Sequence, residues 1–124
     1  MTADEFIDKK NKQFKTNSVI KVKDIGRKGS HFLVREAWTF LTQSNLSEKV
    51  FVIERLRKES TEGELAYQNS WNKGDIEYRI GYFIVGKIDR TKGKWIWGQF
   101  CPLIPQQDLV SLLDKARKEG TITI

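Results

Sequence analysis

The pattern that most strongly suggests chemistry is a pair of tryptophans, Trp95 and Trp97, beside a group of basic residues. On a strand, residues two apart project from the same face, about 7 Å from one another. Rings on a sheet face with cations beside them are typical of proteins that bind single-stranded nucleic acid, because bases stack on the rings and lysines contact phosphates. The same pair in a central strand also fits a packed core, so both interpretations stay open.

A second concentration of positive charge lies between Lys9 and Arg35, where nine basic residues stand against Asp24 alone, a net charge of +8. The whole chain carries a formal charge of +6, so the remainder has a net charge of −2. Concentrated positive charge attracts polyanions in a salt-dependent way, although lysines also simply solvate exposed surfaces. The pattern therefore predicts phosphate contacts from the first third of the chain.

Trp71 stands apart because it lies in a polar segment, Gln68 to Gly74. A tryptophan in a loop has no sheet face to fill, so it either folds back over the core or binds a partner. Together these signals predict a nucleic-acid-binding set of cations and rings: Lys21, Lys23, Arg27, Lys28, Trp71, Tyr78, Lys87, Arg90, Lys92, Lys94, Trp95 and Trp97.

Signals for catalysis, cofactors and metals are weak. Cys101 could serve as a nucleophile only beside His31, the single histidine, and next to Phe100 it fits a small buried hydrophobe better. Carboxylates that could pair for acid–base work are Glu54, Asp75 and Glu77. The run from Gly26 to Ser30 lacks the spacing of a phosphate-binding loop and indicates a basic turn. We predict no catalytic residue, no cofactor and no metal site.

The elements that must position these residues are mostly strands. Thr2 to Glu5 fits a capping box that opens a short helix to about Phe14. Pro105 opens a second helix, which Gly120 ends, and its leucines form an apolar stripe. Alternation predicts strands over 19–24, 31–42, 50–57, 76–88 and 94–100, with short ones over 65–67 and 121–124 and a turn-like segment over 58–63.

Details of these strands place their side chains. In the strand over 31–42, four apolar residues separated by Glu36 are expected on one face: Phe32, Val34, Trp38 and Phe40. In the strand over 94–100, Trp95 and Trp97 share one face, with Ile96 and Phe100 on the other. Gly81 and Gly86 mark a bulge, a bend or a close backbone approach.

We therefore predict an α+β fold, mostly β: a bent antiparallel sheet or half-open barrel with a C-terminal helix and a short N-terminal helix. Residues 1–124 form a single domain, in which 1–17 could be a loosely docked basic arm. No run of about 18 apolar residues occurs and the N-terminus is charged, so we expect a cytoplasmic protein without a membrane partner.

The stretch from Trp71 to Pro105 resembles small uncharacterised bacterial proteins. The resemblance rests on Tyr78-Arg79-Ile80-Gly81-Tyr82 and on Trp97-Gly98-Gln99-Phe100-Cys101-Pro102. It implies a bacterial, cytoplasmic origin. It implies no activity, ligand or catalytic residue, and the basic first third of the chain lies outside it.

The sequence thus favours a small basic module that binds nucleic acid. The alternatives are a protein-interaction or regulatory subunit, which includes the case of a homodimer, and a small-molecule pocket walled by aromatic residues. Catalysis is a further alternative, but no residue pattern in the sequence favours it.

Overall fold

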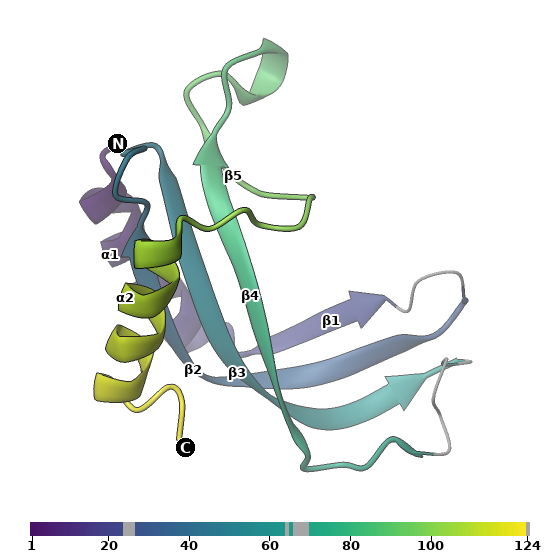
Figure 1. Cartoon of the computed structure of the whole chain (residues 1–124). Coiled ribbons are helices and arrows are strands. Elements are labelled where there is room, and N and C mark those ends of the chain that lie inside the picture. The colour runs from purple at the N-terminus through teal and green to yellow at the C-terminus, as the bar shows by residue number, and fades with distance from the viewer. Residues whose placement is uncertain (24–26, 64, 66–69, 124) are drawn as a thin grey trace.

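One strongly bent antiparallel sheet with strands in sequential order organises the molecule (Figure 1). The computed structural model describes residues 1–23, 27–63, 65 and 70–123. The predicted mostly-β fold, a half-barrel with a helix at each end of the chain, is confirmed. The strands are β1 (Val19–Lys23), β2 (Ser30–Thr42), β3 (Lys49–Glu62), β4 (Ile76–Val85) and β5 (Trp95–Trp97).

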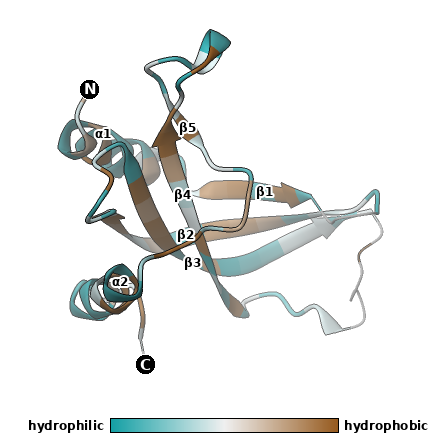
Figure 2. Ribbon diagram, turned by 45° about the horizontal axis from the view of Figure 1, so that its top comes forward, coloured by the Kyte–Doolittle hydropathy of each residue, from teal (hydrophilic) through white to brown (hydrophobic). Residues whose placement is uncertain are grey.

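Two helices pack on opposite faces of this sheet at one end (Figures 1 and 2). α1 (Ala3–Thr16) covers a face that includes Val52 and Phe83, and α2 (Gln106–Lys118) covers a face that includes Ile53 and Tyr82. Because successive strand residues point to opposite faces, β3 and β4 contribute alternate apolar residues to two separate cores. The far ends of β2 and β3 extend beyond both helices.

α1 begins at the predicted capping box. The Thr2 hydroxyl accepts the Glu5 N–H at 3.2 Å, and the Glu5 carboxylate accepts the Thr2 N–H at 3.0 Å, which lowers the pKa of Glu5. Phe6 and Phe14 are both buried in the core beneath the helix. α1 is therefore packed on the sheet through these two rings, whereas the sequence also allowed a loosely docked arm.

A β-bulge at Glu36 changes which residues of β2 share a face, so the structure differs here from the prediction. The register shifts between Arg35 and Ala37, so Glu36 and Ala37 lie on the same side of the strand. Trp38 and Phe40 then face α1, opposite to Phe32 and Val34, and the prediction of one shared face was wrong. The bulge also leaves Arg35 on the α1 face, where it reaches β3.

Several strand boundaries differ from the prediction. Residues 58–62 continue β3 because they pair with β2, and are not a turn. β4 ends at Val85, and β5 ends at Trp97, because the chain there leaves to reach α2, so Phe100 is outside any strand. Thr121 and Ile122 bond to the Ala116 carbonyl and cap α2 instead of forming a strand. The predictions for Asp24, Gly26, residues 66–69 and Ile124 lie outside the described residues.

Gly81 and Gly86 lie where other groups approach the backbone closely. A close backbone approach is one of the three alternatives that the sequence allows, beside a bulge and a bend. A Cβ at residue 81 would overlap the Trp97 ring, and a Cβ at residue 86 would overlap Thr91. Among the described residues, neither helix has the length and apolar character needed to cross a membrane.

We predict that Leu112→Ala lowers the free energy of unfolding by about 2–5 kcal/mol, since Leu112 is fully buried between α2 and the sheet. Urea unfolding followed by circular dichroism measures this. Val110→Ala, an exposed position of the same helix, is the matched control and should stay within about 0.5 kcal/mol of wild type. Equal losses in both variants would contradict the docking of α2 through Leu112.

Candidate functional site

A carboxylate buried in the centre of the sheet is held by two arginines from the neighbouring strands. Glu54 on β3 has a side chain only 1% exposed. Its Oε2 accepts the Arg35 Nε–H at 2.6 Å, and its Oε1 accepts the Arg79 Nε–H at 2.8 Å. Arg79 Nη2 also donates to Oε2, at 3.2 Å. We call these three residues the Arg–Glu–Arg bridge; its net charge is +1.

The two arginines of the bridge are not equivalent. Arg35 has a side chain 8% exposed; its guanidinium lies 3.6 Å from the Phe14 ring centroid and donates from Nη1 to the Asn17 carbonyl at 3.0 Å. Arg79 is 33% exposed, and its Nη1 has no acceptor among the described residues. Arg35 is thus committed to the fold, while Arg79 keeps donors directed away from Glu54.

The bridge forms the floor of a cavity of about 310 Å³, which we call the cleft. The cleft draws residues from α1 and from all five strands, so the curl of the half-barrel creates it. Its lining consists of three rings, the bridge and two residues of β1: Phe14, Phe83, Trp97, Arg35, Glu54, Arg79, Ile20 and Lys21.

Trp97 presents its indole to the cleft from β5. The ring lies against Gly81, where any side chain would overlap it, and meets the Phe83 ring edge-on at 4.9 Å. The Arg79 guanidinium is 5.0 Å from its centroid. Although these contacts fix the ring, Trp97 remains 39% exposed.

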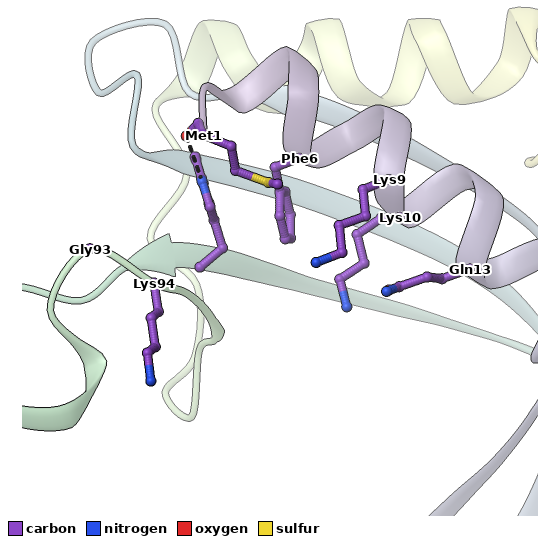
Figure 3. A pocket seen from close by; sticks show the side chains of 8 residues that line it. Met1, Phe6, Lys9, Lys10, Gln13, Gly93 and Lys94 are labelled. Carbon is purple, nitrogen blue, oxygen red and sulfur yellow. Dashed lines mark hydrogen bonds between the residues drawn. The ribbon is translucent and has the colours of Figure 1, made fainter.

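A second cavity, of about 280 Å³, lies between α1 and the hairpin that joins β4 to β5; we call it the helix pocket. Figure 3 shows Lys9, Lys10 and Gln13 extending from α1 on one side and Lys94 extending from the hairpin on the other. Trp95 closes the pocket; it stacks on Phe6 at 4.7 Å and donates from Nε1 to the Met1 carbonyl at 3.0 Å.

Lys10 lies between the two cavities. It lines the helix pocket, while its Nζ is 5.0 Å from the Phe83 centroid and 6.0 Å from the Phe14 centroid, two rings of the cleft. Burial lowers the pKa of Lys10, and the charges of Lys9 and Arg35 lower it further. No carboxylate among the described residues compensates this ammonium group.

The structure brings together part of the predicted set. Lys94 and Trp95 meet at the helix pocket, and Trp97 lies in the cleft. Lys21 borders the cleft through its strand, but its ammonium lies 5.6 Å from the Phe32 ring, on the opposite face of β2 from Arg35.

Other members of the set lie elsewhere. Lys87 forms an ion pair with Glu48 at 2.7 Å, and four cations are exposed at the hairpin tip or beyond β1: Arg90, Lys92, Arg27 and Lys28. Lys23 is exposed at the end of β1. Tyr78 is exposed on the face of β4 opposite Arg79.

Trp71 folds back rather than standing free. Its Nε1 donates to His31 Nδ1 at 3.1 Å, and the Lys58 ammonium lies 5.9 Å from its ring. His31 is buried, whereas Cys101 is exposed, so the expectation of a buried Cys101 was wrong.

Of the carboxylates considered for acid–base work, Glu54 is the centre of the bridge and Glu77 pairs with Lys58 at 2.9 Å. Within the part of the chain that the structure describes, no three His, Cys, Asp or Glu side chains gather to hold a metal ion.

Sequence reasoning missed Arg35 and Arg79, which line the cleft, and Lys10, which lines the helix pocket. Arg35 and Lys10 were counted only as part of a charged window. A signal existed in β3, since Glu54 directly follows the apolar run from Val50 to Ile53 and a buried carboxylate requires cationic partners. Which cations reach the Glu54 carboxylate depends on the register between β3 and its neighbouring strands, and the sequence does not give that register.

Comparison with protein-family models, with curated proteins and with solved structures found no match. The resemblance of residues 71–105 to small bacterial proteins therefore stays a prediction.

We predict that Glu54→Gln lowers the free energy of unfolding by about 3–5 kcal/mol, because two arginines lose the charge that compensates them. Glu36→Gln is a matched control. Glu36 also bridges two arginines, Arg55 at 3.3 Å and Arg57 at 3.1 Å, but in a solvated setting, so its replacement should cost at most about 1 kcal/mol. Chemical denaturation of both variants makes the comparison; equal costs would contradict a structural role for the bridge.

We predict that Lys10→Met raises the unfolding midpoint at pH 7. The pKa of Lys10 is lower in the folded state, so the unfolded chain holds that proton more tightly, and the penalty is present at neutral pH. Stability of the wild type should rise as the pH increases through this lowered pKa. Lys12→Met, at an exposed position paired with Asp8 at 3.2 Å, should not raise the midpoint. A lower midpoint for Lys10→Met would show that the ammonium is compensated.

Proposed function

We propose that this protein is a small nucleic-acid-binding module that uses the face bearing α1 and β5. The observation that carries the proposal is the alternation of cations and rings around two adjoining cavities. Lys9, Lys10 and Lys94 surround Trp95 in the helix pocket, and the bridge stands beside Trp97 in the cleft.

This arrangement matches the two chemical features of a nucleic acid. Its phosphates attract cations and release counterions on binding, and its bases stack on aromatic side chains. Two features of Lys10 and Arg79 support an anionic partner. Lys10 lacks a compensating carboxylate among the described residues, and Arg79, which lines the cleft, has an Nη1 without an acceptor among the same residues.

The net charge of the chain, +6, adds a long-range attraction to the same partner. Cations outside the two cavities, on the hairpin tip and beyond β1, would then steer the polyanion without contacting it closely.

A second candidate is an interaction with another protein, favoured by an exposed apolar segment between β5 and α2. Phe100 and Leu103 are both strongly exposed, and Val110 lies exposed on α2. Large apolar side chains left exposed on a surface segment are typical of contact surfaces. Analytical ultracentrifugation tests the homodimeric form of this candidate: a monomer at all concentrations would count against it.

The proposal predicts salt-sensitive binding that depends on the helix pocket. Fluorescence anisotropy with a labelled single-stranded DNA 10-mer should show it at low ionic strength. The double variant Lys9→Gln/Lys94→Gln should bind more weakly, and the slope of log K against log salt should become shallower by about 0.7 for each phosphate that the variant no longer neutralises.

The matched control for charge is Lys12→Gln/Lys118→Gln, which removes two positive charges from exposed positions outside both cavities. It should leave the slope unchanged. Absence of salt-sensitive binding by the wild type to any single- or double-stranded DNA or RNA would overturn the proposed function.

A further inference from the structure

Trp97 is a rigid aromatic surface that the fold leaves partly uncovered. The absence of a side chain at Gly81 lets the indole settle on the backbone of β4, and Phe83 supports its edge. A ring held in this way loses little conformational freedom when a ligand packs against it. Its exposed portion faces a cavity that cations border.

Arg79 and Lys10 stand at opposite ends of this aromatic surface. Arg79 contacts the Trp97 ring, and Lys10 contacts the Phe83 ring that adjoins it. Glu54 fixes the orientation of the Arg79 guanidinium through two hydrogen bonds, from Nε and Nη2, which leaves Nη1 on the side away from Glu54. Successive contacts therefore run from Arg79 through Trp97 and Phe83 to Lys10, which lines the neighbouring helix pocket.

We propose that the cleft binds one unpaired nucleotide of a single-stranded nucleic acid, with its base against the Trp97 indole and its flanking phosphates on Arg79 and Lys10. This inference rests on the proposed function and adds to it a binding site for one nucleotide, which we call the nucleotide seat. The cavity of about 310 Å³ is at the lower end of the range for ligand sites, roughly 300–1,000 Å³.

Strand selectivity follows from this geometry. In a duplex, neighbouring base pairs cover both faces of every base, so no base can pack on Trp97 without first leaving the stack. A single strand offers its base faces without that cost. The bridge and Lys10 then supply an attraction common to all sequences, and Trp97 supplies the preference for unpaired bases.

The test compares two single-stranded 10-mers with identical phosphates, one mixed-sequence DNA and one in which every nucleotide is abasic. Anisotropy measures the affinity of the full chain for each. The wild type should bind the abasic strand about 5- to 150-fold more weakly, the range expected when one base no longer stacks. It should also prefer the intact strand to a 10-base-pair duplex.

Variants assign the discrimination to the cleft. Trp97→Leu should bind the intact and abasic strands nearly equally, and Trp97→Tyr should restore most of the difference. Tyr78→Leu is the matched control, because Tyr78 is 40% exposed, much as Trp97 is, but lies on the opposite face of the sheet; it should keep the full difference. Circular dichroism confirms folding, and the wild-type comparison decides the question if Trp97→Leu does not fold.

The other possible outcomes contradict either the nucleotide seat in the cleft or the proposed function as a whole. Salt-sensitive binding of equal strength to intact, abasic and duplex DNA removes the nucleotide seat and leaves the proposed function standing. Discrimination that survives in Trp97→Leu also removes it. If the protein binds neither intact, abasic nor duplex DNA, both the nucleotide seat and the proposed function are contradicted. A free nucleoside monophosphate that binds as tightly as the 10-mer shows that the ligand is a small molecule and not a strand.

Discussion

The structure depends on the need of one buried carboxylate for positive charge. Glu54 lies at the middle of the central strand, where its desolvation would be costly without partners. Arg35 and Arg79 meet that need from β2 and β4, and so the bridge ties three strands together across the α1 face. Since two cations surround one anion, the same arrangement that stabilises the sheet leaves an excess positive charge at the floor of the cleft.

Positions without a side chain matter as much as those with one. At Gly81 the Trp97 indole occupies the space of a side chain, and at Gly98 the Tyr82 ring does so on the other face. Both contacts lie at the end of β5, where the chain leaves the sheet toward α2. The short β5 ends at Trp97, and the indole of this last strand residue lines the cleft.

Much of the fold could be predicted from periodicity, because alternation in β4 and the leucine stripe of α2 reflect burial on defined faces. The site could not. Arg35 reaches Glu54 only because a bulge at Glu36 resets the alternation of β2, and a bulge leaves no reliable mark in one sequence. The sequence allows Trp97 either in a core or on a binding surface; its half-exposed position depends on the shortness of β5 and on a close approach to Gly81.

The most direct test is a ¹H–¹⁵N spectrum of the tryptophan indoles during titration with single-stranded DNA. Three indole N–H groups already donate to acceptors that do not line the cleft: Trp38 donates to Asn11, Trp71 to His31 and Trp95 to Met1. If the cleft seats a base, the Trp97 resonance should shift most, while those of Trp38 and Trp71 stay in place. A titration in which the Trp71 resonance moves and that of Trp97 does not would contradict the assignment of the cleft.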